Sequence, residues 1–206
     1  MKRKELKAHI QLKWKYYLLG ILASFIVSIL AVNIASAPTK KEKVAVFLTC
    51  YNTSSSFNEY IESITPDYLE IIELNIKHKE DDYYGTVIKG YRKAADILII
   101  PESKIEYLFM KNCLVLTDEC ISELTNRDYE YYSVDGKNYG IKVYSKDTDS
   151  GILEGLVDFN KEGSEEDCYL FINNKSLHLG KYNNSKYDGA ISILKEILNY
   201  EAQSSE

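Results

Sequence analysis

One segment of the sequence, residues 16–37 (YYLLGILASFIVSILAVNIASA), contains no charged side chain over 22 residues. At a rise of about 1.5 Å per residue, a helix of this length measures roughly 33 Å and would cross a hydrocarbon core about 30 Å thick. The preceding head, residues 1–15, carries six Lys and Arg side chains against one Glu. The positive-inside rule then predicts a cytoplasmic head and an extracytoplasmic remainder. The segment therefore predicts a single-pass protein of the cell membrane.

The same segment has an alternative interpretation as a cleaved signal peptide. Signal peptides usually have an apolar core of about 7 to 15 residues followed by a small-residue cleavage site. Ala35, Ser36 and Ala37 offer such a site, but Pro38 would follow the scissile bond and fits an extended protease-bound strand poorly. The length of the core and the proline favour a retained anchor, and both alternatives stay open.

The chain beyond the head is acidic. Subtracting the head's +5 from the whole-chain charge of −6 leaves −11 for residues 16–206. Nucleic acid and anionic lipid bind positive patches, so this charge argues against both as partners of the outer part. About 165 residues follow the anchor, enough for one domain with a sizeable core. We expect a linker at residues 38–43, a domain at residues 44–200 and a frayed tail at residues 201–206.

Short apolar segments and amphipathic helical patterns alternate along this domain. The alternation is typical of βαβ units, so the predicted class is α/β, with a single, mostly parallel twisted sheet and flanking helices. Apolar segments predict strands at residues 44–49, 69–76, 95–100, 168–173 and 176–180, and a hairpin of residues 131–134 and 138–144 that turns at Asp135-Gly136. Helical periodicity predicts helices at residues 57–64, 84–91, 104–111, 118–124, 151–159 and 190–198.

Polar residues follow the first and third predicted strands, where ligands of parallel sheets usually bind. The first turn contains Tyr51, Asn52, Thr53, Ser54 and Ser55, and the second contains Glu102 and Ser103. An alternative is purely structural, because serine is a preferred N-cap and each turn has the spacing of a capping box. Tyr139 in the hairpin could add an apolar platform to a site at this edge.

The four cysteines, Cys50, Cys113, Cys120 and Cys168, include no CxxC pair. Three disulfide pairings can be drawn, and buried reduced thiols are an equal alternative. Cys50 follows a strand and precedes a five-residue loop and a helix, which is the layout of Cys-dependent phosphatases. Those enzymes have an arginine after the loop, where this sequence has Ser56. Because nothing in the loop would stabilise a thiolate, we expect no enzyme.

Metal and cofactor chemistry find little support in the sequence. His78 and His178 are about a hundred residues apart, and no HxH or HExxH spacing occurs. The acidic residues 80–82 are flanked by lysines and fit a solvated loop. The sequence also lacks the P-loop, GxGxxG and GxSxG motifs. We expect no metal and no cofactor.

Three short motifs follow one another between residues 93 and 145. They are Ala95-Asp96-Ile97, Leu116-Thr117-Asp118 and Asp135-Gly136-Lys137-Asn138-Tyr139-Gly140. In order and spacing they resemble the first lobe of type II solute-binding proteins of ABC importers. The resemblance covers residues 44–145, and it implies that residues 168–200 supply the returning strands and helix. Only residues 146–167 lie between, which is too short for a second sheet domain, so the resemblance implies a single lobe with half a cleft.

These observations predict a membrane-anchored, extracytoplasmic and non-catalytic binding module. Its partner would be a small solute or a peptide, bound at the two turns. Half a cleft covers little of a small ligand, so another envelope protein or a second copy of the chain is an alternative partner. The competing hypothesis is a structural or assembly subunit of a cell-envelope membrane complex without a small-molecule ligand.

Overall fold

The computed structural model describes residues 3–35, 38–78, 89–91, 93–159 and 166–201. The chain divides into two compact units, Met1–Pro38 and Thr39–Glu206. The first contains the helix α1 (Arg3–Ala35), whose segment Lys13–Val32 is long and apolar enough to cross a membrane by length and composition. This agrees with the helix that the sequence predicts for residues 16–37.

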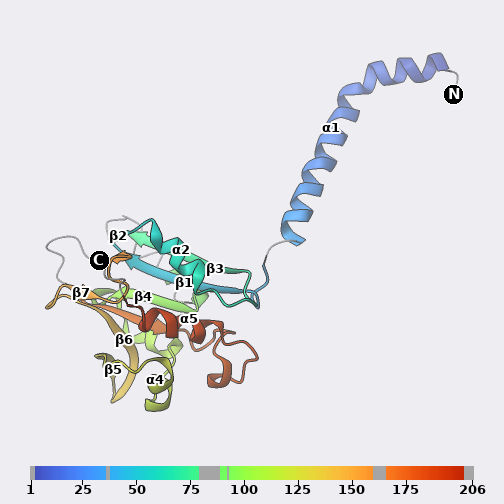
Figure 1. The fold of residues 1–206 in the computed structure, drawn as a ribbon. Helices are drawn as coiled ribbons and strands as arrows, with labels where there is room; N and C mark the ends of the chain where they lie inside the picture. The colour runs from blue at the N-terminus through green and yellow to red at the C-terminus, as the bar shows by residue number, and fades with distance from the viewer. Residues whose placement is uncertain (1–2, 36–37, 79–88, 92, 160–165, 202–206) are drawn as a thin grey trace. The chain divides into compact units, whose positions relative to one another are not determined.

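The second unit is an α/β domain built on a seven-stranded mixed sheet (Figure 1). Its strand order is β3-β1-β4-β9-β6-β5, with β7 paired to β6. The pairs of β1 with β3 and with β4 are parallel, whereas the pairs from β4 through β9 and β6 to β5 are antiparallel. The strands are β1 (Lys43–Cys50), β3 (Ile71–His78), β4 (Ile97–Pro101), β5 (Tyr131–Val134), β6 (Lys137–Ser145), β7 (Ser150–Gly151) and β9 (Cys168–Ile172).

Hydrophobic side chains cover both faces of the sheet, which explains why every residue of β4 and β9 is buried. On one face, α2 (Ser56–Ser63), α4 (Asp118–Leu124) and α5 (Gly189–Leu198) pack in the larger core. On the other, Phe47, Leu98 and Phe171 pack against Phe109 and Met110 of the 3-10 helix η2 (Tyr107–Asn112). The α/β class is confirmed, and the sheet is parallel only in its β3-β1-β4 part.

Most predicted elements appear near their expected places. The hairpin of β5 and β6 turns at Asp135 and Gly136, whose φ angles of 51° and 72° are the positive values that such a turn requires. Thr117 caps α4 by accepting a hydrogen bond of 3.3 Å from the backbone N–H of Cys120. The capping-box spacing in the turn after β1 is that of Ser56 and Glu59, but no capping box forms there, because the N-cap is Ser55 and its side chain makes no capping bond. The predicted helix at residues 84–91 lies mostly outside the described residues.

Three predictions of secondary structure are wrong. Residues 104–111 form no continuous helix: η1 (Glu102–Lys104) and η2 are separated by two residues with extended backbone. Residues 151–159 form β7, a turn and β8 (Val157–Asp158), because the backbone of Leu153 and Gly155 is left-handed. Residues 176–180 form turns before the 3-10 helix η3 (Gly180–Tyr182), since the neighbours His178 and Leu179 are both buried and the alternation of a strand fails.

Candidate functional site

The turn after β1 is bound along its length by a distant part of the chain. Its short strand β2 (Asn52–Thr53) pairs antiparallel with β8. The backbone N–H of Tyr51 donates to the carbonyl of Asp158 at 2.8 Å, and that of Ser54 donates to the carbonyl of Leu156 at 2.9 Å. These bonds hold the turn in place at the carboxyl edge of the sheet.

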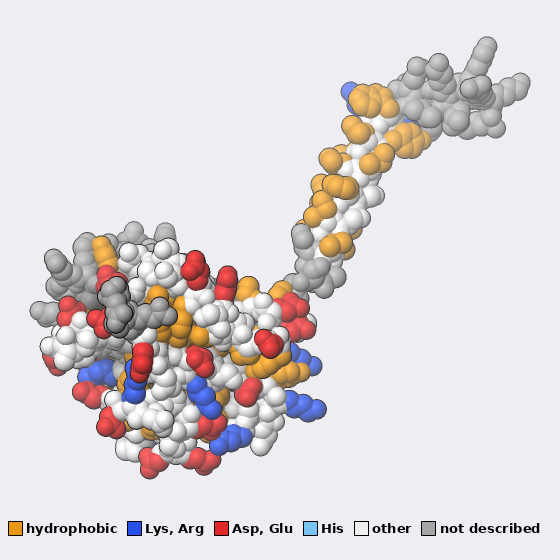
Figure 2. All heavy atoms as spheres, in the orientation of Figure 1, with side chains coloured by type: hydrophobic (Ala, Val, Ile, Leu, Met, Phe, Trp, Pro, Cys, Tyr) orange, Lys and Arg blue, Asp and Glu red, His pale blue; other side chains and the backbone are white. Residues whose placement is uncertain are grey.

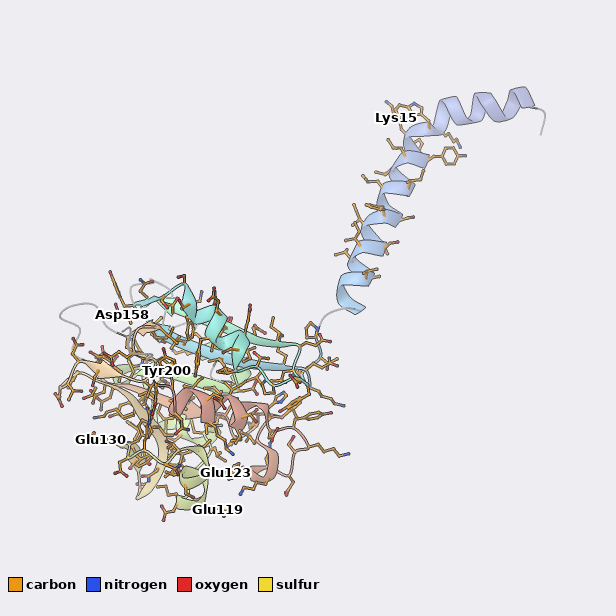
Figure 3. The ribbon with its side chains drawn as sticks, viewed as in Figure 1. Lys15, Glu119, Glu123, Glu130, Asp158 and Tyr200 are labelled. Carbon is orange, nitrogen blue, oxygen red and sulfur yellow. The ribbon has the colours of Figure 1, made fainter. Side chains whose placement is uncertain are left out.

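A hollow of about 1030 Å³ lies between this turn and the segment that follows β6. Tyr51, Asn52, Thr53 and Ser54 line it from the turn. Figure 3 labels one residue of the opposite wall, Asp158, at the end of the domain where β2 and β8 pair. The remaining lining residues come from the end of β6 and from the segment that follows it through β7 and β8 to residue 159: Tyr144, Lys146, Asp149, Ser150, Gly151, Ile152, Glu154, Gly155, Leu156, Val157 and Phe159.

Residues 146–159 face the turn across the hollow, and we call them the second wall. Part of this wall has an unusual backbone conformation. Asp149, Leu153 and Gly155 have φ angles of 47°, 60° and 79°. Leu153 is buried, so its side chain anchors the turn in the core while its backbone adopts a conformation that costs about 1 kcal/mol or more. A Cβ on Gly151 would lie 2.9 Å from the carbonyl oxygen of Val143, so only glycine fits there without displacing the backbone of β6. Such outliers persist only where the surrounding structure fixes them, and they are typical of binding sites.

A buried ion pair holds the base of this wall. The ammonium of Lys142 lies 2.9 Å from the carboxylate of Asp167, and the second carboxylate oxygen accepts a 2.9 Å bond from the backbone N–H of Lys146. Burial raises the pKa of Asp167, but these two donors outweigh it, so the pKa lies below its usual value. The pKa of Lys142 is raised, chiefly by its hydrogen bond to Glu130 and against the effect of burial. The pair links β6 to the start of β9.

The lining offers polar groups over an apolar floor. Tyr144 and Phe159 form the floor, with ring centroids 5.7 Å apart, and the Tyr144 hydroxyl donates to the Asp149 carboxylate. Lys146 and Asp158 are exposed, so the rim carries charges of both signs. Hydroxyl and amide groups of the turn add neutral donors and acceptors. This arrangement suits a ligand that has charged or hydrogen-bonding groups on an apolar body.

The other residues predicted for the site lie elsewhere. Glu102 and Ser103 follow β4 at the same edge, but their backbone N–H groups donate to the Asp167 carbonyl at 2.9 Å and to the Glu166 carboxylate at 3.3 Å. Glu102, Ser103 and Ser55 are not among the described residues that line the hollow. Tyr139 packs with the second core cluster, on the face of the sheet opposite to Tyr144. The structure therefore brings Tyr51, Asn52, Thr53 and Ser54 together and leaves the rest apart.

The second wall was missed because residues 151–159 have apolar residues at helical spacing. The glycines at positions 151 and 155, together with Asp147 and Asp149 just before them, are the signal of turns that could have found it. Residues 157 and 158 pair with β2, about a hundred residues earlier in the chain. The sequence near residues 157 and 158 contains no pattern from which this pairing could have been predicted.

None of the four cysteines forms a disulfide, and all are buried. Cys50 and Cys168 lie at the carboxyl edge, but both are 0% exposed and neither lines the hollow. Burial raises the pKa of the Cys120 thiol, which further favours its unreactive form. Within the described part of the chain, no three His, Cys, Asp or Glu side chains are grouped to hold a metal ion.

Comparisons of the chain with protein-family models, with curated proteins and with solved structures find no match.

Proposed function

We propose that this chain is a single-span membrane protein whose extracytoplasmic α/β domain binds a small polar solute or a short peptide in the hollow at the carboxyl edge of its sheet. The binding is non-catalytic. The observation that carries the proposal is the hollow itself, formed by the turn that the sequence predicts as a site and by a strained wall that folds over it.

The chemistry of the lining supports a ligand with polar ends. Lys146 offers an ammonium, Asp158 a carboxylate and Asn52 an amide, all exposed at the rim. An amino acid, a dipeptide or a small zwitterion presents complementary groups. The rings of Tyr144 and Phe159 would contact its apolar part.

The order of the strands supports the resemblance to a single lobe of a solute-binding protein. The chain leaves the sheet after β7 and re-enters it as β9, between β4 and β6 and antiparallel to both. Where two-lobed solute-binding proteins have a second lobe, this chain has residues 146–159, which line the hollow opposite the turn after β1. A one-lobe protein could in this way cover more of a ligand than half a cleft would.

Membrane attachment and orientation belong to the same proposal. Support comes from the helix α1, whose segment Lys13–Val32 has the length and the apolar composition of a membrane span. The basic head, residues 1–15, supports a cytoplasmic N-terminus.

A thermal-shift screen of the detergent-solubilised full chain tests the binding site. The panel would contain free amino acids, dipeptides and monosaccharides. A ligand at a hundred times its dissociation constant should stabilise the domain by about 2.7 kcal/mol, or about 5 to 10 °C in Tm. Asn52→Ala with Ser54→Ala should abolish the shift with little change in the unliganded Tm, because both side chains are exposed.

The matched control is Glu102→Ala with Ser103→Ala, at the other predicted turn. It should keep the full shift because these residues do not line the hollow. The assignment of the binding site would be rejected if both double variants lost the thermal shift equally. It would also be rejected if both variants kept it. A protein partner that copurifies in stoichiometric amount without any bound metabolite would favour the assembly-subunit alternative.

A further inference from the structure

Residues 39–42, which we call the connector, precede β1 and are bonded to the α/β domain. The carboxylate of Glu42 accepts hydrogen bonds of 2.9 and 2.7 Å from the backbone N–H and the hydroxyl of Thr39. The Glu42 carbonyl accepts bonds of 2.8 and 3.3 Å from the backbone N–H groups of Glu70 and Ile71. The connector therefore runs as part of the domain surface before β1 begins at Lys43.

A buried histidine adds a second attachment. His178 is 1% exposed, and its Nε2 lies 2.9 Å from the carbonyl oxygen of Lys40. The ring packs closely against Gly189, where an added Cβ would lie 3.2 Å from Nδ1. Since α1 ends at Ala35, only four peptide units separate the helix from Thr39, which is at most about 14 Å of chain.

Exposed hydrophobic side chains surround this attachment. Outside α1, four large hydrophobic residues of the described chain are exposed, and Tyr68, Ile71 and Leu177 are three of them, at 44%, 44% and 45%. Ile71 bonds to the connector through its backbone, and Leu177 directly precedes His178. We call Tyr68, Ile71 and Leu177 the connector rim. Figure 2 shows hydrophobic side chains on the domain surface beside the entry of the connector.

We propose that the connector rim docks on the lipid bilayer, with its three apolar side chains in the headgroup layer. The inference rests on the proposed membrane anchor. If α1 spans the membrane, a fastened connector of this length holds the rim within reach of the lipid surface. Tyrosine favours that layer because its ring is apolar and its hydroxyl is polar.

The charges near the rim indicate what kind of surface it accepts. Exposed side chains of both signs occur in the segments around the rim, with a net charge near zero: Lys40, Lys41, Lys175 and Lys186, and Asp67, Glu70 and Asp188. A balanced rim gains little from anionic lipid, so docking depends on apolar burial and not on lipid charge.

Docking in this way fixes where the hollow lies. β1 starts beside the connector and runs over eight residues, about 23 Å from Lys43 to Cys50 at the carboxyl edge. The hollow at that edge therefore lies at the end of β1 that is far from the rim, where a solute or peptide can reach it.

Quenching of tryptophan fluorescence by brominated lipid tests the docking. The chain has one tryptophan, so Trp14→Phe gives a silent background. Leu177→Trp places a probe in the rim, and Asp147→Trp places a matched probe at the exposed opposite edge. The full chain is reconstituted in vesicles of phosphatidylcholine with and without brominated acyl chains.

We expect brominated lipid to reduce the fluorescence emission of the Leu177→Trp probe. The emission of this probe should also be blue-shifted. Brominated lipid should leave the emission of the Asp147→Trp probe unchanged. The reduction should be the same when anionic phosphatidylglycerol is mixed into the vesicles. Should the Leu177→Trp chain fail to fold, Ile71→Trp provides the second rim probe.

Carbonate extraction separates the two proposals. A chain that resists extraction but shows no quenching at the rim overturns the docking and leaves the anchor in place. A chain that is extracted overturns the anchor. The emission of the rim probe could instead be blue-shifted without any quenching by brominated lipid. If that blue shift grows with the protein-to-lipid ratio, a second copy of the chain covers the rim, and the docking on lipid is overturned.

Discussion

Lys142 and Asp167 form an ion pair of 2.9 Å whose side chains are only 13% and 8% exposed. Charges at this depth are costly to leave without a partner, and Asp167 also holds the backbone of Lys146 at the wall of the hollow. The pair thus connects the stability of the sheet to the shape of the candidate site.

Asp167→Asn should lower the free energy of unfolding by about 2 kcal/mol, because Lys142 loses its buried carboxylate partner and keeps the exposed Glu130. Urea unfolding in detergent measures the change. The control is Glu201→Gln, which removes the exposed pair of Glu201 with Arg127 and should cost about 0.5 kcal/mol or less. Equal losses in both variants would show that the buried pair has no special role.

Glu123 should make the domain sensitive to acid. It accepts bonds from Lys181, Tyr182 and Lys195, and the first two chiefly lower its pKa to about 2. Because the folded pKa lies below the unfolded value near 4.5, this stabilisation is present above about pH 4.5 and is lost as the pH falls toward 2. Figure 3 labels Glu123 and its neighbour Glu119 near the base of the domain.

Glu123→Gln should therefore lower the free energy of unfolding at pH 7, by about 1 kcal/mol for a pair at the surface, and have less effect at pH 3. Urea unfolding at both pH values measures the difference. The control is Glu119→Gln, whose 3.0 Å pair with Lys181 is more exposed and should contribute less at pH 7. An effect of Glu123→Gln that is equally large at pH 3 would contradict this account.

Gly151→Ala should deform the second wall, because the new Cβ would lie 2.9 Å from the Val143 carbonyl. We expect a loss of about 1 to 3 kcal/mol of stability together with weaker ligand binding. The exposed neighbour Ser150→Ala serves as the control and should change stability by less than about 0.5 kcal/mol. A Gly151→Ala variant with unchanged Tm would mean that the wall is not packed as described.

All four cysteines should react slowly with iodoacetamide in the folded protein and rapidly in urea, because each is buried outside any disulfide. Mass spectrometry of alkylated peptides measures each site. Rapid, pH-dependent alkylation of Cys50 in the folded domain would contradict the non-catalytic assignment, since it would reveal a reactive thiolate.

The elements that were predicted from sequence are those with a strong local signal. The apolar segment of β4, the Asp135-Gly136 turn and the amphipathic face of α5 each depend on residues close in sequence, and each is present. The helix predicted at residues 151–159 failed because tertiary pairing with β2 outweighed a helical pattern.

The candidate site shows the same division. Tyr51 to Ser54 could be predicted because parallel strands end at a common edge. Tyr139 was placed wrongly at that edge, since strand register and sheet face decide its position and neither can be read from the hairpin motif. The places of Lys146 and Asp158 in the lining could not be predicted, because they depend on how the segment after β6 folds back beside the turn that follows β1.

Native mass spectrometry of the detergent-solubilised full chain tests the central claim most directly. The account predicts a small-molecule adduct on the wild type that is absent from the Asn52→Ala, Ser54→Ala variant and retained by the Glu102→Ala, Ser103→Ala control. An adduct that persists in the first variant, or a stoichiometric protein partner in place of any adduct, would contradict it.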